Sequence, residues 1–304
     1  SEEIVDVWRT AQDIYPRRWE DRFVIGSGYS KSVTEAVNTL LNQKKISPKE
    51  INKAILYSPD GRSYQGLARG LGLDTKSQVQ DPLFASVGNS GTASPLLLLA
   101  AALEEAKPGD LLLLASYGDG SDALLFRVQE GIKRFQKGLG VKGHLKSKRM
   151  LANYEKYLRF RDLLESPTDF LRRRSQVSSA SAMWRDRSQV LSLHGSRCRQ
   201  CAMITFPIQR VCYACQAVDD YEEIRLYEDR GKVFTFTMDN LAGGYEPPQI
   251  MVCLEMPNGS RIYCEMTECE HSEVKIEMPV EMTFRKVHEG AGFYNYFWKA
   301  RPVR

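Results

Sequence analysis

The pattern of apolar and polar positions in the first 130 residues predicts alternating helices and strands. Apolar residues recur at helical spacing between Val33 and Leu41, and the run Lys53–Tyr57 that follows predicts a strand. Ser94 and Pro95 predict a helix start, because serine caps free amides and proline has no amide to leave unsatisfied. This alternation is typical of an α/β domain with a largely parallel sheet.

The same pattern continues to the end of this region. We expect the helix that Ser94 caps to run from Pro95 to about Ala106, before the turn residues Pro108–Asp110. Leu111–Ala115 then predicts a buried strand, and a second strand over Ala123–Val128 follows a tight glycine turn.

The last third of the chain has short segments of strand-like composition separated by turns. About five strands in such a segment predict a small all-β barrel of the OB type. The predicted strands are Ile224–Tyr227, Lys232–Thr237, Ile250–Met256, Arg261–Met266, Val274–Ile276 and Glu281–Val287.

A basic, helical segment joins these two regions. One helical stripe of this segment predicts packing against a core or a partner, and it consists of Tyr154, Tyr157, Leu158, Arg161 and Leu164. Residues 131–197 carry 16 Lys and Arg against 5 Asp and Glu, including the run 172–174. A solvated face, an acidic partner and a phosphate-bearing ligand all suit this charge.

We therefore predict four parts: an α/β domain over residues 1–135, a helical connector over 136–193, a cysteine-rich ribbon over 194–218 and a β domain over 219–304. The 304 residues, 42% hydrophobic, suffice for about two domains. No apolar run approaches the roughly 18 residues of a membrane span, and no signal peptide is recognisable. We expect a cytoplasmic protein that is not bound to membranes.

Four cysteines, Cys198, Cys201, Cys212 and Cys215, form two C-x-x-C pairs. This spacing is typical of a tetrahedral zinc site, and a reducing cytosol favours zinc over disulfides. Four thiolates leave no open coordination position, so the predicted zinc is structural. The first 197 residues contain no cysteine.

Several motifs of the first 130 residues belong together by their order and spacing. They are Asp6-Val7-Trp8-Arg9, Tyr15-Pro16, Gly28-Tyr29-Ser30, Gly88–Ser94 and Tyr117–Gly120. These motifs resemble the C-terminal half of a hydroxymethylglutaryl-CoA synthase or a related thiolase-fold condensing enzyme. The resemblance implies two similar halves around one active site, of which the first supplies an acyl-accepting cysteine and the second a histidine and an asparagine.

The resemblance assigns the asparagine role to Asn89, although a plain turn residue also suits this position. The family's histidine is missing, and either Tyr57 or Asp60 can occupy its space, unless both are only turn residues. Gly118 and Gly120 suit close approach of the backbone to a coenzyme A thioester, and equally suit a simple hairpin.

The chain from about Tyr154 onward resembles the rubredoxin-like zinc ribbon with OB-fold family that accompanies thiolases. Ala202 stands where that family usually has glycine, which predicts slight strain in the metal-binding turn. Members of this family typically do no chemistry but bind the condensing enzyme and shape its acyl-CoA site.

Together the resemblances imply half of an acyl-CoA acyltransferase that needs a cysteine-bearing first half. That half is supplied either by a thiolase-fold partner in a hetero-oligomer or by a longer parent protein. A non-catalytic, acyl-CoA-binding scaffold for a separate thiolase is the alternative. A nucleic-acid-binding OB module is a further alternative, but residues 216–304 carry 10 basic against 16 acidic side chains, which opposes phosphate contact. We interpret the aromatic residues of this region as barrel core and partner surface: Phe234, Phe236, Phe293, Tyr294, Tyr296, Phe297 and Trp298.

Overall fold

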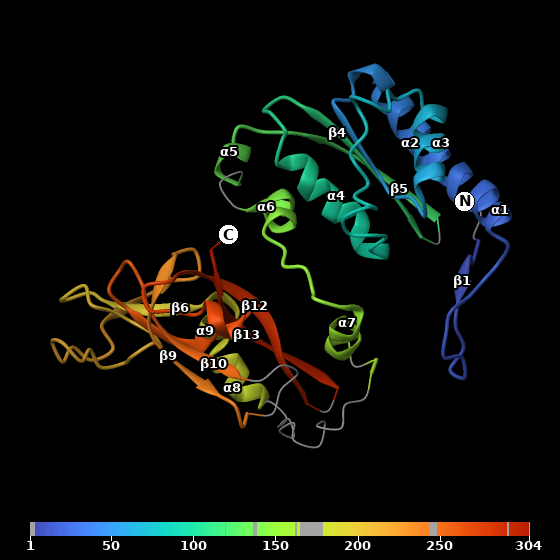
Figure 1. Cartoon of the computed structure of the whole chain (residues 1–304). Helices are drawn as coiled ribbons and strands as arrows, with labels where there is room; N and C mark the ends of the chain where they lie inside the picture. Colours follow the sequence, from blue (N-terminus) through green and yellow to red (C-terminus); the bar gives the residue numbers. More distant parts are fainter. Residues whose placement is uncertain are drawn as a thin grey trace. The chain divides into compact units, whose positions relative to one another are not determined.

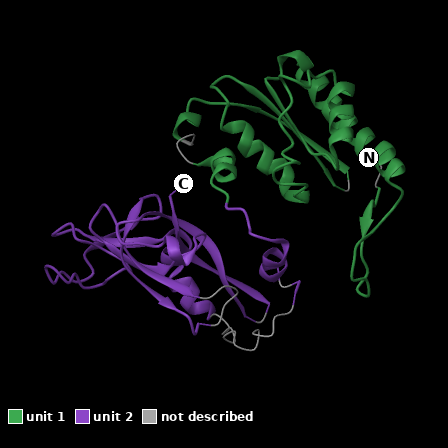
Figure 2. Ribbon diagram, viewed as in Figure 1, with its two compact units in different colours: residues 1–148 green, residues 149–304 purple. Residues whose placement is uncertain are grey.

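The chain folds into two compact units, Ser1–Lys148 and Arg149–Arg304 (Figure 2). The computed structural model describes residues 4–118, 120–135, 139–161, 163–164, 179–242, 248–290 and 292–303. The basic run 172–174 lies outside these described residues. Within them, no helix combines the length and the apolar character needed to cross a membrane.

The first unit is built on a three-stranded sheet in the order β3-β4-β5. Strand β3 (Lys53–Leu56) runs parallel to β4 (Leu111–Gly118), and β5 (Gly120–Arg127) returns antiparallel to β4. The predicted strands are therefore present, and β5 begins directly after the glycine turn.

Helices cover both faces of this sheet (Figure 1). Ala54 and Leu56 of β3 pack in one core cluster with residues of α2 and α3, whereas Ile55 packs with residues of α4 in another. The side chains of successive strand residues point to opposite faces of the sheet, which accounts for this division. The helical elements are α1 (Asp21–Phe23), η1 (Val24–Ser30), α2 (Lys31–Lys44), η2 (Pro48–Glu50), α3 (Gly61–Gly70), η3 (Gly91–Ala93), α4 (Ser94–Leu103), α5 (Ile132–Phe135) and α6 (Gly140–Lys146).

The first unit extends beyond residue 135 because α6 packs against α4. The Glu104 carboxylate accepts hydrogen bonds from the backbone amides of Val141 and Lys142. At the other end of the unit, β1 (Val7–Trp8) and β2 (Arg17–Arg18) form a short antiparallel hairpin.

The second unit contains a small ribbon sheet and a five-stranded sheet. The ribbon strands β6 (His194–Cys198), β7 (Ile204–Thr205) and β8 (Tyr221–Arg225) pair in the order β7-β6-β8. The larger sheet has the order β11-β10-β9-β12-β13, and a parallel bridge between Met266 and Ala300 links its two ends. Its elements are β9 (Gly231–Asp239), β10 (Gln249–Glu255), β11 (Arg261–Glu265), η5 (His271–Glu273), β12 (Pro279–Gly290) and β13 (Phe293–Pro302).

Three features of the second unit differ from the sequence prediction. The predicted strand Val274–Ile276 is wrong: the 3-10 turn η5, closed by Glu270 and Glu273, precedes it, and these residues join no strand. Strand β13 was not predicted, because its aromatic residues fall on both faces and hide the alternation. Of the predicted stripe, Tyr154, Tyr157 and Leu158 lie on α7 (Tyr154–Phe160), which buries none of its residues, and Arg161 and Leu164 follow this helix. The stripe is therefore not part of a core, and packing against a partner stays a prediction. Two further helices are α8 (Ala180–Arg185) and α9 (Arg187–Ser192).

Candidate functional site

The first candidate site is a cavity of about 190 Å³ in the N-terminal unit. Residues from the β1–β2 hairpin, from η1 and from the ends of β3 and β4 line it. The lining residues are Asp6, Val7, Arg18, Val24, Ile25, Tyr29, Tyr57, Pro59, Asn89 and Tyr117. Two predicted site residues, Tyr57 and Asn89, therefore share one cavity.

Three tyrosines form one wall of this cavity. Tyr57 directly follows β3 and Tyr117 lies near the end of β4, so the parallel strands bring both to the same sheet edge. The Tyr29 ring meets the rings of Tyr57 and Tyr117 edge-on, with centroid distances of 6.4 and 5.6 Å. The Tyr29 hydroxyl donates to the backbone oxygen of Tyr57 at 2.8 Å, and burial raises the pKa of Tyr29. Tyr29 therefore stays protonated and supports the wall.

Asn89 lies in the loop before α4 and is tied to the loop after β3. Its Nδ2 donates to the backbone oxygen of Pro59 at 3.3 Å, and its Oδ1 accepts from the amide of Gly91 at 2.8 Å. An asparagine amide has two N–H groups, so the Pro59 bond occupies only one of them. The exposed side chain is thus held at the cavity with a donor to spare.

Asp60 is placed differently from Tyr57 and Asn89. It caps α3: its Oδ1 accepts from the amides of Arg62 and Ser63 at 2.8 and 2.9 Å, and its Oδ2 from the Ser63 hydroxyl at 2.7 Å. Burial alone would raise the pKa of Asp60, but these hydrogen bonds to Ser63 and Arg62 outweigh it and lower the pKa. Asp60 is not among the residues that line the cavity.

Gly118 and Gly120 flank the turn between β4 and β5, where they pair with each other. Gly120 has a φ of +112°, a conformation that glycine adopts without strain. A side-chain carbon at either position would meet no atom within 4 Å. The hairpin accounts for Gly120, and neither glycine lines the cavity. Asp119, between them, lies outside the described residues.

The second candidate site is the cluster of Cys198, Cys201, Cys212 and Cys215, whose sulfur atoms all lie within 4.8 Å of one another. The Sγ–Sγ distances are 3.5 Å for Cys198–Cys215 and also for Cys201–Cys212. A tetrahedral zinc with Zn–S bonds of about 2.3 Å requires sulfurs about 3.8 Å apart, so the cluster fits such an ion.

Two equivalent turns hold the four sulfurs. The amide of Ala202 donates to the Cys198 oxygen at 3.0 Å, and the amide of Gln216 donates to the Cys212 oxygen at 2.9 Å. Both donor residues have a left-handed backbone conformation, with φ of 61° for Ala202 and 63° for Gln216. The predicted strain at Ala202 is confirmed, because a side chain is disfavoured in this conformation.

The thiols of the cluster have unequal acidities. A hydrogen bond from the Cys215 amide, the largest effect, lowers the pKa of Cys212 to about 7. At Cys215 a bond from the Ala217 amide favours the thiolate, but burial and the neighbouring sulfurs raise its pKa to about 12. Four adjacent thiolates thus repel one another unless a cation compensates their charge.

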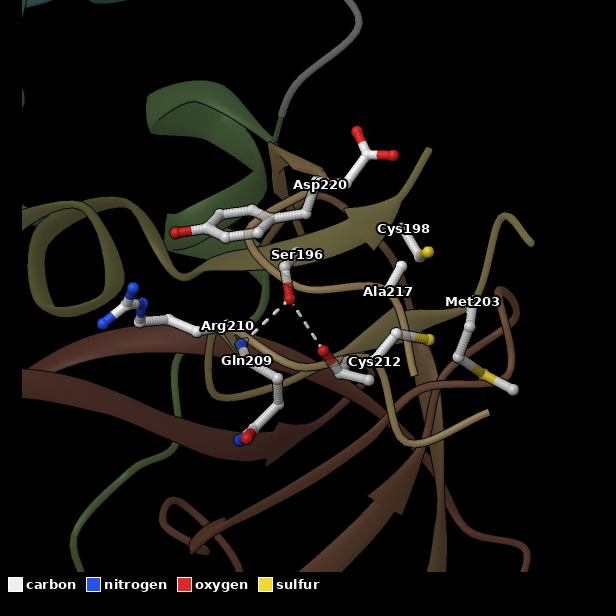
Figure 3. Close-up of a pocket in the computed structure, with 10 residues that line it drawn as sticks. Ser196, Cys198, Met203, Gln209, Arg210, Cys212, Ala217 and Asp220 are labelled. Carbon is white, nitrogen blue, oxygen red and sulfur yellow. Dashed lines mark hydrogen bonds between the residues drawn. The ribbon is translucent and has the colours of Figure 1, made fainter. Parts of the chain in front are cut away.

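The protein interior beside the cluster leaves almost no free space. The cavity there measures about 10 Å³, close to the smallest space that holds one water. Figure 3 shows the Ser196 hydroxyl directed at Gln209, whose backbone N–H donates to the hydroxyl oxygen at 3.1 Å. The Thr205 hydroxyl lies 2.8 Å from the same Ser196 oxygen. The arrangement suits a structural metal and not a substrate site.

Of the residues that line the first site, sequence reasoning gave a role to Tyr57 and Asn89 and missed Tyr117 and Arg18, among others. Tyr117 was noted only as part of a motif, although its position at the end of a predicted strand was a usable signal. Arg18 carried no signal, because only pairing of β2 with β1 brings it to the cavity.

Two family models match separate units of the chain. The C-terminal model of 3-oxoacyl-[acyl-carrier-protein] synthase III matches residues 41–127, and the model of the C-terminal OB-fold domain of ChsH2 matches residues 225–285.

Two curated proteins illustrate the same division. A hydroxymethylglutaryl-CoA synthase of Methanopyrus kandleri is 31% identical over 162 residues, which are 53% of this chain and 46% of that protein. A DUF35 domain-containing scaffold protein of Methanocaldococcus jannaschii is 31% identical over 116 residues, 36% of this chain and 82% of that protein. The chain therefore spans less than half of the synthase and most of the scaffold protein.

Among solved structures, a chain of the Ltp2-ChsH2(DUF35) aldolase covers 42% of this chain and 98% of its own length. Its identity is 18% and its TM-score 0.34, too low to carry an argument.

Proposed function

This chain belongs to the DUF35 domain-containing family, with a thiolase-like domain fused to its OB-fold domain, and on this premise we propose that it supplies one half of an acyl-CoA acyltransferase site. The other half, with the nucleophilic cysteine, comes from a thiolase-fold partner in a hetero-oligomer. The cavity that unites Tyr57 and Asn89 at one sheet edge is the observation that carries this proposal.

The residues of the cavity suit the chemistry of acyl transfer. A cysteine thiolate attacks a thioester, and hydrogen-bond donors must then stabilise the negative oxygen that forms. We assign this donor role to the amide of Asn89, and proton transfer at the reacting group to the Tyr57 hydroxyl. Asp60 positions this region by capping α3. The first 197 residues lack a cysteine, which the partner half must therefore supply.

An uncovered strip on β5, which the described helices leave exposed, supports the need for a partner half. Leu124 and Phe126 of β5 pair with the buried Leu114 and Leu112 of β4 and so share the face on which α4 packs. Nevertheless, Leu124 and Phe126 are 50% and 38% exposed. We propose that a thiolase-fold partner covers this strip beside α4.

We assign zinc to the four cysteines, as a cross-link that fixes the ribbon and takes no part in acyl transfer. The second unit then binds the partner and acyl-CoA. Gly118 and Gly120 do not line the cavity, and we assign them only backbone contact with the coenzyme A portion outside it. Reduced thiols are maintained in the cytosol, so we place the complex there.

The alternative is a scaffold that binds acyl-CoA for a separate thiolase without contributing catalytic groups. The missing histidine and the engagement of Asp60 as a helix cap favour it. The side-chain amide of Asn89, a hydrogen-bond donor that lines the cavity, favours the first proposal, in which the chain supplies half of the catalytic site.

Native mass spectrometry of the protein purified from its source organism tests the proposal. We expect a cysteine-bearing, thiolase-fold partner in the complex, and its loss when Phe126→Glu places a charge on the uncovered strip. The matched control is Asp122→Glu, on the exposed part of the same strand, which should keep the partner. A chain that purifies alone contradicts the proposal.

A further inference from the structure

The N-terminal hairpin places an arginine at the candidate acyl site. Val7 of β1 pairs with Arg18 of β2, and both residues line the cavity that contains Tyr57 and Asn89. Arg18 is the one cationic residue among those that line the cavity. Its guanidinium lies 3.1 Å from the Asp21 carboxylate, and five N–H donors leave it able to bind a second acceptor.

Besides the pairing of its two strands, the hairpin is held by contacts that do not involve the Arg18 side chain. The Asp13 carboxylate accepts from the Thr10 amide at 3.0 Å and from Arg17 Nη2 at 2.6 Å. The rings of Trp8 and Trp19 lie with centroids 4.7 Å apart. Neighbouring strand residues point to opposite faces, which explains why Arg17 closes the hairpin while Arg18 reaches the cavity.

The size and lining of the cavity define what it can hold. A volume of about 190 Å³ has room for a short acyl group, because on the same measure the space of about 10 Å³ beside the cysteines is close to the minimum for one water. Val7, Val24 and Ile25 supply apolar surface for a short carbon chain. Asp6 shares the lining and balances the charge of Arg18, which favours a neutral oxygen over a carboxylate.

We propose that Arg18 is a specificity-determining residue that donates a hydrogen bond to an oxygen substituent on a short acyl chain. This inference rests on the proposed function, because it takes the cavity as the acyl site. A charged donor at this position selects oxygen-substituted acyl groups over plain hydrocarbon ones of the same length.

Binding of two matched thioesters, acetoacetyl-CoA and butyryl-CoA, to the full chain together with any copurifying partner tests the inference. We expect acetoacetyl-CoA to bind at least tenfold more tightly, R18Q to remove this preference and R18K to restore part of it. The matched control is R22Q, which alters an exposed arginine of α1 that neither lines the cavity nor closes the hairpin and should keep the preference.

A preference that survives R18Q, or that is absent from the unaltered protein, overturns the inference. Equal loss in R22Q and R18Q also overturns it, because the effect would then come from the loss of a positive charge and not from a contact with the ligand. Failure of the proposed function gives a different result, namely no acyl group on the partner's cysteine whatever the preference in binding.

Discussion

The side-chain amide of Asn89 donates a hydrogen bond to the backbone oxygen of Pro59, 30 positions earlier in the chain, at 3.3 Å. This bond joins the loop before α4 to the loop after β3, and Tyr57 begins the second of these loops. The contact explains how two predicted site residues from distant segments come to line one cavity.

Gly28 allows close contact between η1 and the tyrosine wall. A side-chain carbon at Gly28 would lie 2.5 Å from the Tyr117 hydroxyl. We expect Gly28→Ala to displace Tyr117 and to destabilise the unit by about 1–3 kcal/mol. Gly26→Ala, in the same helical segment but with no atom within 4 Å, should change stability by less than about 1 kcal/mol. Thermal unfolding compares the two, and equal effects would contradict this packing.

The cap at Asp60 predicts a pH-dependent contribution to stability. Because the folded-state pKa of Asp60 is lowered, the ionised carboxylate stabilises the fold above its unfolded pKa of about 3.9, and this stability is lost as the pH falls through the folded value. Asp60→Ala should cost about 1 kcal/mol at pH 7 and progressively less below pH 4. Denaturant unfolding across this range checks it, with Asp122→Ala, on exposed β5, as the control. A cost that persists undiminished at low pH would count against the cap.

The cysteine cluster predicts one tightly bound zinc per chain. We expect elemental analysis to find one zinc in the unaltered protein and far less in Cys212→Ser, which removes a ligand and loosens the ribbon. Cys253→Ser is the matched control, because Cys253 lies in β10 outside the cluster. Equal zinc content in both variants would refute the assignment.

The left-handed turns of the cluster predict a stabilising substitution. Replacing Ala202 by glycine should relieve about 1 kcal/mol of backbone strain and slow zinc loss to a chelator. Gln216→Gly, at the equivalent φ of 63°, should act in the same direction. Ala214→Gly, in the turn but without positive φ, should be neutral or destabilising. Faster zinc loss from Ala202→Gly would contradict the strain.

The cysteine spacing and the helix over α2 could be predicted because their signals are local. A C-x-x-C pair closes its own turn, and helical periodicity repeats within a few residues. The thiolase-like and OB-fold parts were predicted from motifs, and the family matches confirm them.

Arg18 and β13 show why the rest could not be predicted. Arg18 reaches the cavity only through pairing with Val7, and nothing in the neighbouring sequence marks it. In β13 the aromatic residues Tyr294 and Tyr296 are exposed whereas Asn295 between them is buried, the reverse of the usual pattern. Asp60 was ambiguous for another reason, because a catalytic carboxylate and a helix cap occupy the same kind of loop position.

The most direct test of the account is acyl transfer to the partner, measured by mass spectrometry after incubation with acetyl-CoA. We expect an acetyl group on a partner cysteine only when this chain is present, and a 10²- to 10³-fold slower reaction with Asn89→Ala. Asn42→Ala, on the exposed surface of α2, should react normally. Acetylation of the partner at the same rate without this chain, or with Asn89→Ala, would contradict the half-site and leave the scaffold role.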